Sequence, residues 1–321
     1  MQGFDPKFQD FPEYILTTTR EIWEDHGLAR GVAEYLHPDV IQRSPLGVYV
    51  GADQAKAQMM ATLVAIPDRS MMSEDVIWSG SDAVGFLGSQ RILSTGTHKG
   101  AGVFGAPTGR KLRYRVLTDS YAKANQISDV WSVQDTGAIL RQLGLDGADW
   151  ARDQLSVMDP AQAPLRPAVD VVGPYTGPGN ASQWGVGFAS LLTQMMEGEF
   201  SVVAQQYDRA CHLCYPGGLE THGPEAAEAF WMGLRSSFPS ARFEIHHRIG
   251  MEEPLMPARA AVRWSLTGRH DGWGTFGRPT GAEVHVMGMS HAEFGPWGLR
   301  REWTLIDEAA IWMQIQHTIG G

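Results

Sequence analysis

One aspartate of the chain has the residue type and the setting for acid–base chemistry. Asp119 lies in a predicted strand, where alternation places it on one face with Arg113, Arg115 and Tyr121. A carboxyl group in an apolar pocket holds its proton more tightly, which suits it to proton transfer near neutral pH. Asp119 is therefore a candidate acid/base, with Tyr121 as an orienting group. The alternative is an ion pair with Arg113 or Arg115 at the sheet surface.

Two histidines occupy equivalent places in a glycine-rich motif that occurs twice. His98 lies within residues 96–109 and His270 within residues 268–281, and both segments read Gly-x-His-x-Gly-x-Gly-x-Phe-Gly-x-Pro-Thr-Gly. A histidine at this position could polarise a substrate carbonyl or act as a base. It could equally be structural, with its imidazole hydrogen-bonded within the loop. The glycines suit a tight connection with positive φ or close backbone approach.

The motif belongs to a repeat that extends over most of the chain. His98 and His270 are 270 − 98 = 172 positions apart, and the same offset pairs identical residues far outside the motif, among them Tyr35 with Tyr207, Trp131 with Trp303 and Gln142 with Gln314. A shared offset over more than a hundred residues indicates a tandem duplication of one domain. We expect a first copy over residues 1–150, a Pro/Gly-rich linker over 151–180 and a second copy over 181–321.

Each copy is predicted to place helices first and long strands after them. Apolar spacing and alternation in the first copy predict helices at 11–28, 32–36 and 51–66, strand-like segments at 40–50, 73–79, 83–97, 111–123 and 126–133, and a closing helix at 136–143. The second copy repeats this order. Helices packed on one face of a curved antiparallel sheet make an α+β fold. The resulting cone leaves a mouth in which a small molecule could bind.

Composition limits the classes of partner and location. The 321 residues are 43% hydrophobic and 19% charged, as in globular proteins. A net charge of −10 without a basic tract argues against nucleic acid and against an anionic membrane surface as partners. The first ten residues lack the pattern of a signal peptide, and no apolar run approaches the roughly 20 residues that span a bilayer. We expect a cytoplasmic protein with a small-molecule substrate, and self-association to a homo-oligomer is left open.

Metal binding is a further hypothesis for the second half, which holds eight of the 11 histidines. His285 and His291 share one strand face, but six residues along a strand is roughly 20 Å, too far for a shared ion. His291 and Glu293, two residues apart, could share an ion only with a third ligand from another strand. Cys211 and Cys214 form a lone C-x-x-C on a predicted strand, where positions three apart point to opposite faces. We therefore expect neither a metal nor another cofactor.

A family resemblance rests on several of these segments together. The stretch GTHKGAGVFGAPTGR at 96–110, the strand with Asp119, Ile127–Trp131 and the tail Leu140–Gly144 resemble the SnoaL-like polyketide cyclases. These belong to the nuclear-transport-factor-2-like superfamily of α+β cone folds. The resemblance implies two such cones, packed as a pseudo-dimer, and cofactor-free acid/base chemistry next to a carbonyl. Family cyclases close a ring by aldol condensation, with an aspartate moving the proton.

The two copies differ at the position of that aspartate. Asp119 matches it if the following turn is one residue shorter than usual, whereas the second copy offers His291, or Ser290 after a one-residue slip. The first copy is thus expected to carry Asp119, His98 and Tyr121, and the second to be a diverged site using His291 or a structural partner. The aromatic residues Trp131 and Trp303, with His270, are candidates for substrate contact or for core packing. The rival hypotheses are a non-catalytic module that binds an apolar molecule and a structural scaffold.

Overall fold

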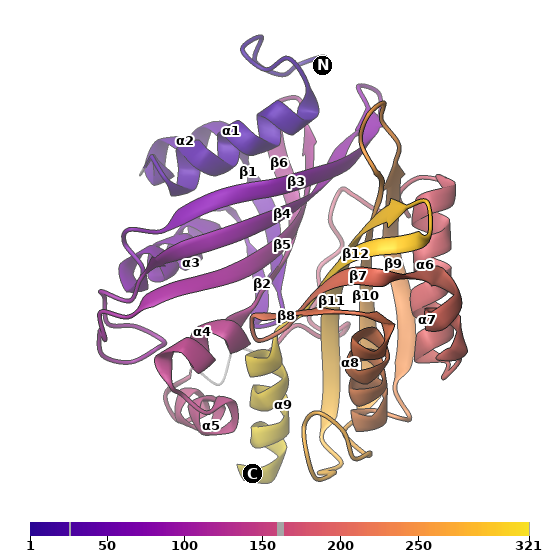
Figure 1. The fold of residues 1–321 in the computed structure, drawn as a ribbon. Coiled ribbons are helices and arrows are strands. Elements are labelled where there is room, and N and C mark those ends of the chain that lie inside the picture. Colours follow the sequence, from indigo (N-terminus) through magenta and orange to yellow (C-terminus); the bar gives the residue numbers. More distant parts are fainter. Residues whose placement is uncertain (26, 159–163, 321) are drawn as a thin grey trace. The chain divides into compact units, whose positions relative to one another are not determined.

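The computed structural model describes residues 1–25, 27–158 and 164–320, which form two compact units (Figure 1). The first unit comprises Met1–Leu145 and Pro160–Thr176, and the second comprises Asp146–Asp159 and Gly177–Gly321. We refer to them as the first and the second copy.

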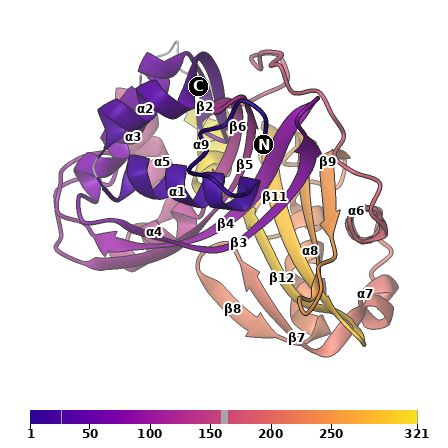
Figure 2. The ribbon, with the colours of Figure 1, turned by 90° about the horizontal axis from the view of Figure 1, so that it is seen from above.

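The first copy is a six-stranded open sheet with helices. Its elements are α1 (Phe11–Trp23), α2 (Leu28–Tyr35), β1 (Leu36–Ser44), β2 (Gly47–Val50), α3 (Ala52–Ala65), β3 (Ser70–Ser81), β4 (Gly85–Thr97), β5 (Lys111–Lys123), β6 (Gln126–Gln134) and α4 (Thr136–Leu143). The strand order is β2-β1-β6-β5-β4-β3, and β1 and β6 are the parallel pair. Helix α1 runs beside β3 and β4, as Figures 1 and 2 show.

Local sequence signals explain the helix boundaries. The carboxylate of Asp10 accepts the N–H of Glu13 and so caps α1. Two helices were expected here, at 11–28 and 32–36, and the boundary between them lies earlier: α1 ends at Trp23, and α2 begins at Leu28 directly after Gly27. Before α3, Gly51 adopts a φ of 92°, a backbone region that favours glycine.

The second copy repeats the same order of elements. They are α6 (Gln183–Met196), α7 (Ser201–Gln206), β7 (Tyr207–Tyr215), β8 (Leu219–His222), α8 (Pro224–Ser237), β9 (Arg242–Met251), β10 (Ala258–Arg269), β11 (Glu283–Gly295), β12 (Gly298–Ile306) and α9 (Glu308–Gly320). The strand order β8-β7-β12-β11-β10-β9 matches that of the first sheet. The prediction of two tandem α+β cone domains of the nuclear-transport-factor-2-like type is confirmed.

The strand register fixes how the copies correspond. Asp119 pairs with Trp131 across β5 and β6, and His291 pairs with Trp303 across β11 and β12. The offset of 172 therefore holds through this region, and His291, rather than Ser290, is the counterpart of Asp119.

The end of the first repeat and the expected linker contain regular structure. Residues 147–157 form α5 (Gly147–Val157), although the Pro/Gly-rich stretch was expected to start at 151. The Asp146 carboxylate caps this helix, and α5 packs against α9, where Gly147 lies close to Trp312. Further along, Leu165 donates its N–H to the carbonyl of Pro45 in the first copy. Capping and packing thus order part of a segment whose composition signals a loop.

Each sheet has an inner face toward its helices and an outer face away from them. In the first copy an added Cβ on Gly88 would lie 3.0 Å from Phe11 of α1, and Gln90 hydrogen-bonds to Thr19 of α1. These two β4 residues pair with Ser120 and Thr118 of β5. Since side chains alternate along a strand, the even-numbered positions of β4 and β5 face inward and the odd-numbered ones outward.

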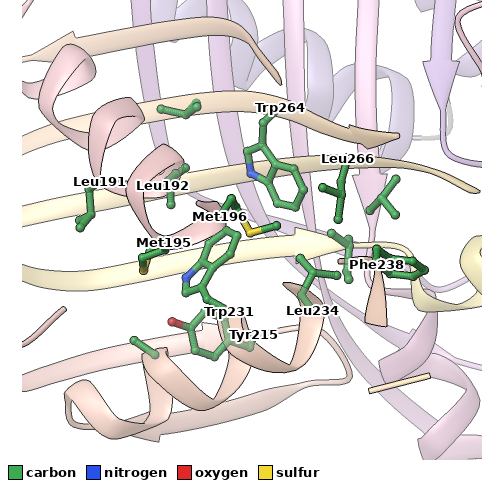
Figure 3. Close-up of a cluster of buried hydrophobic side chains, with 14 of the residues drawn as sticks. Leu191, Leu192, Met195, Met196, Tyr215, Trp231, Leu234, Phe238, Trp264 and Leu266 are labelled. Atoms are coloured by element: carbon green, nitrogen blue, oxygen red, sulfur yellow. The ribbon is translucent and has the colours of Figure 1, made fainter. Parts of the chain in front are cut away.

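The inner face of the second copy is filled by a large apolar cluster (Figure 3). Trp231 from α8 and Trp264 from β10 are both fully buried at its centre, with ring centroids 5.6 Å apart. Residues of α6 surround them, including Leu192 and Met195. The second cone is thus closed by its own side chains.

Candidate functional site

The inner face of the first copy carries a row of neutral polar groups. Thr19 donates from its hydroxyl to Oε1 of Gln90 at 3.0 Å, and Nε2 of Gln90 donates to the hydroxyl of Ser73 at 3.1 Å. Nearby on the sheet, the hydroxyls of Thr118 and Ser132 are 2.9 Å apart. Thr118 and Ser132 are only partly buried. This wall offers hydrogen-bond donors and acceptors without a fixed charge.

The second copy keeps one polar pair of this wall and replaces other polar residues by apolar ones. Thr118 and Ser132 are matched by Ser290 and Thr304, whose hydroxyls are 2.8 Å apart. At the offset of 172, Thr19, Gln90, Ser94 and Tyr114 are replaced by Leu191, Val262, Leu266 and Val286. All four replacements are buried in the core cluster of the second copy, and Figure 3 shows Leu191 and Leu266 among them. The tryptophans at its centre, Trp231 and Trp264, stand in place of Met59 and Ile92. The two inner walls therefore differ at the positions of Thr19, Gln90, Ser94 and Tyr114, which are polar in the first copy and apolar in the second.

A buried carboxyl group that the sequence analysis missed lies within the second cone. Glu302 of β12 is fully buried, and its Oε2 accepts the hydroxyls of Tyr207 at 2.7 Å and Tyr215 at 3.0 Å. Its Oε1 accepts from Thr304 at 2.6 Å and from the indole N–H of Trp231 at 3.2 Å. Burial raises the pKa of Glu302, although all four hydrogen bonds oppose this effect.

This carboxyl group is structural in its setting. Its two oxygens are occupied by four donors from the surrounding elements, which leaves little capacity for a ligand. The first copy has Val130 at the same position. Glu302 alternates with outward-facing residues along β12 and so points to the inner face of the sheet. This could be recognised only when the strand register was known.

Asp119 and Tyr121 lie together on the outer face of β5. Asp119 is 2% exposed and pairs across the sheet with Ser89 and Trp131. Tyr121 donates its hydroxyl to the carbonyl of Val84 at 2.7 Å. The prediction that Asp119 and Tyr121 share one face of the strand is confirmed. This face points away from α1. A one-residue shift along a strand reverses the face of a side chain, so Thr118, not Asp119, faces the cone.

Trp131 takes part in a buried charged network on the same outer face. The guanidinium of Arg43 lies 4.5 Å from the centroid of the Trp131 ring and binds Asp129 at 2.9 Å. Arg43 also binds Asp170 at 2.6 Å, and Asp129 accepts the N–H of Tyr175. Arg115, one of the two arginines expected as an ion-pair partner of Asp119, forms an ion pair with Glu74 at 3.1 Å. This region holds several buried charges through mutual pairing.

The second copy places His291 and Trp303 as cross-strand neighbours on its outer face. Both are buried, with exposures of 0% and 5%. Because His291 is at outward parity, it does not face the apolar cluster that fills the cone. The two candidate residues are thus brought together, but away from the inner wall.

His98 and His270 hold their loops in the same way. In the first copy Nδ1 of His98 lies 3.2 Å from the hydroxyl of Thr108, and in the second Nδ1 of His270 lies 3.1 Å from that of Thr280. Both rings are completely buried, and burial lowers the pKa of His270. His98 follows β4 beside Lys111, eight residues along β5 from Asp119, which is roughly 26 Å. The structure therefore does not bring His98 to Asp119.

A hollow of about 560 Å³ lies elsewhere in the first copy, between α2, β1 and the start of α3. Its lining includes Leu36, Val50, Asp53 and Gln126, and none of the residues singled out from the sequence. Within the described ranges, no three His, Cys, Asp or Glu side chains gather where a metal ion could bind. No helix in the described part of the chain has the length and hydrophobicity needed to cross a membrane.

Comparisons with known proteins match both copies. The family model described as SnoaL-like polyketide cyclase matches residues 13–143, and the one described as SnoaL-like domain matches residues 189–302. No curated protein sequence matches the chain.

Similar solved structures align with a single copy. IdmH from Streptomyces antibioticus is 20% identical, covering 42% of this chain and 100% of its own, with a TM-score of 0.37. AclR from Streptomyces galilaeus is 21% identical over 41% of this chain and 94% of its own, with a TM-score of 0.36. TsrD from Streptomyces laurentii is 16% identical over 42% and 98%, with a TM-score of 0.36. With a family match in each half, the chain belongs to the SnoaL-like family, of which it carries two domains in tandem.

Proposed function

We propose that the protein is a SnoaL-like small-molecule enzyme whose first copy holds the substrate against its inner wall, while the second copy is a closed structural domain. The observation that carries this proposal is the contrast between the two inner walls. That of the first copy is partly exposed and carries Gln90, Ser94 and Tyr114, whereas that of the second has apolar residues at these three positions and is filled by Trp231 and Trp264. At these three positions the sister domain packs well with apolar residues, so the fold by itself does not require the polar groups of the first copy.

The groups on this wall suit a ligand that carries carbonyl and hydroxyl oxygens. One hydroxyl of the Thr118–Ser132 pair, and the second amide hydrogen of Gln90, can each donate to a carbonyl oxygen. Tyr114, at inward parity on β5, is 2% exposed and its hydroxyl has no hydrogen-bond partner among the described residues. A donor held in a buried site polarises a carbonyl more strongly than one in water.

The reaction we propose is cofactor-free proton transfer next to that carbonyl, leading to cyclisation, isomerisation or dehydration. Tyr114 donates a hydrogen bond to the carbonyl oxygen and so stabilises the enolate, while a solvent water molecule accepts the neighbouring proton and returns a proton in the product. Asp119 faces the other side of the sheet, so its contribution is expected to be to the stability of the first copy rather than to substrate binding.

The test is calorimetric titration and turnover assay with a panel of aromatic and polyketide-like carbonyl compounds. The double variant Ile92→Trp with Val116→Gly builds into the first copy the pair Trp264 and Gly288 that helps to fill the second. It is expected to abolish binding, and Tyr114→Phe to lower turnover by about tenfold to a hundredfold.

Asp119→Asn is the matched control on the outer face and is expected to keep ligand affinity within about twofold, since it adds no bulk to the inner wall. Binding that survives the filled first cone, or that is lost in Asp119→Asn while the fold is retained, contradicts the proposal. Binding without turnover of any compound would favour the non-catalytic binding module instead.

A further inference from the structure

We infer that the first copy contains a carboxylate-binding subsite formed by Arg69 and Trp23, so that its ligand is an acid as well as a carbonyl compound. The inference rests on the proposed function for the location of the ligand and goes beyond it by naming a class of substrate. It depends on the state of one buried guanidinium group.

Arg69 lies buried, and one edge of its guanidinium group is unpaired among the described residues. It is 7% exposed, and its Nε and Nη2 atoms are buried without a hydrogen-bond partner among the residues that the structure describes. These two nitrogens form one edge of the planar guanidinium group. That edge presents two parallel N–H donors, which match the two oxygens of a carboxylate.

The surrounding residues hold this group at the end of the inner wall. The guanidinium carbon lies 4.2 Å from the centroid of the Trp23 ring, at the last residue of α1. The Cα atom of Arg69 would lie 3.2 Å from a Cβ on Gly96 of β4, which has inward parity. One turn before Trp23, Thr19 contacts the inner wall through Gln90. Arg69 is therefore placed between α1 and the face that we propose for the substrate.

The nearest acidic side chain in sequence to Trp23 is already engaged elsewhere. Glu24 accepts the hydroxyl of Ser70 at 2.9 Å and the N–H of Met71, so its carboxylate is bound to the start of β3. An anion from outside the chain is the remaining natural partner for the open edge of Arg69. Stacking on an aromatic ring stabilises a guanidinium only in part.

The second copy removes the whole arrangement at once. At the offset of 172, Trp23 becomes Met195 and Arg69 becomes Ala241, both buried in the apolar cluster. Burying an arginine without a partner is unfavourable, so a copy under structural demands alone would be expected to lose it. Its presence in the copy with the polar wall points to a ligand, because binding sites retain groups that do not stabilise the fold.

The experiment compares 2-naphthoate with its methyl ester by titration calorimetry at neutral pH. The wild-type chain is expected to bind the acid at least about tenfold more tightly than the ester. Arg69→Met keeps much of the side-chain volume and removes the charge. It is expected to weaken binding of the acid by about tenfold to a hundredfold and to leave binding of the ester within twofold. Arg69→Lys, which keeps the charge but not the fork, is expected to fall between them.

Thermal unfolding without ligand gives a second readout. Arg69→Met is expected to raise the melting temperature, because it removes a buried charge that has no hydrogen-bonded anion beside it among the described residues. The matched control is Arg235→Met in the second copy, whose Nη1 donates to the carbonyls of Phe238 at 3.4 Å and Ala241 at 2.6 Å. That substitution is expected to lower the melting temperature.

Three results would overturn the inference: equal binding of acid and ester by the wild type, failure of the acid to bind, or a lower melting temperature in Arg69→Met. Its failure is separable from that of the proposed function. If the ester binds, the double variant Ile92→Trp with Val116→Gly abolishes this binding, and the acid binds no more tightly than the ester, then the substrate site is supported and the carboxylate subsite is refuted. If acid binding depends on Arg69 but not on the filled cone, the proposed location of the substrate falls instead.

Discussion

Adding a single methyl group at Gly288 is expected to destabilise the second copy, because this glycine makes room for Trp264. An ideal Cβ on Gly288 would lie 2.2 Å from Cζ2 and 2.3 Å from Cε2 of the indole ring. Carbon atoms in contact normally stay about 3.5–4.0 Å apart, so the ring would have to move by more than 1 Å, on the order of a bond length. Trp264 is fully buried and its Nε1 donates to the hydroxyl of Ser290 at 3.0 Å, so the ring cannot move without disturbing its packing and this hydrogen bond.

The magnitude follows from these contacts. Overpacking a dense core costs about 1–3 kcal/mol, and straining a buried hydrogen bond adds about 1 kcal/mol. We expect Gly288→Ala to lower the free energy of unfolding of the second copy by about 3 kcal/mol. Trp264→Ile alone should also destabilise by about 3 kcal/mol through the cavity that it leaves. In the Trp264→Ile background, however, Gly288→Ala should be close to neutral, giving a coupling energy of about 2–3 kcal/mol.

The assay is urea unfolding with hydrogen exchange measured on peptides from β10 and β11, which reports the second copy separately. Gly187→Ala on α6 is the matched control, because Gly187 is exposed and a Cβ there meets no atom within 4 Å among the described residues. It should stabilise by about 0.5–1 kcal/mol through the higher helix propensity of alanine. If Gly288→Ala were neutral in the wild type, or additive with Trp264→Ile, the second cone would not be filled as described.

Two further substitutions test the buried charges. Glu302→Gln should flatten the pH dependence of stability: burial raises the pKa of Glu302, so the folded chain holds this proton to higher pH than the unfolded one, and the wild type loses stability as pH rises above 4.5. Urea unfolding at pH 4.5 and 7.5 measures the difference, and an equal slope in both proteins would refute the assignment. Arg43→Met should lower stability by about 3–5 kcal/mol, since it leaves Asp129 buried without this partner. A thermal shift too small for such a loss would show that the pair contributes little.

The duplication and the α+β cone could be predicted because they depend on spacing alone. An offset of 172 that pairs Trp131 with Trp303 also fixes which strands correspond, and the register agrees with it. The linker was less predictable. Its prolines and glycines indicated a loop, but the Asp146 cap and the packing of α5 on α9 extend helix to Val157.

The face of each candidate residue was harder to predict than its strand. The sequence placed Asp119 correctly beside Tyr121, but the direction of that face depends on where α1 packs, which is a tertiary contact. The filling of the second cone was equally hard to predict. It depends on Trp264 lying over Gly288, and these two residues are 24 positions apart and meet only through strand pairing. Alternation gives two faces, and only packing decides which of them is inside.

The most direct test of the central claim is a crystal structure of the protein in complex with a carbonyl compound that binds in calorimetry. The account predicts one molecule per chain, lying against the inner wall of the first copy, with its oxygens within hydrogen-bond distance of Gln90, Thr118 or Tyr114. A ligand inside the second cone, or against Asp119 on the outer face of the first sheet, would contradict it.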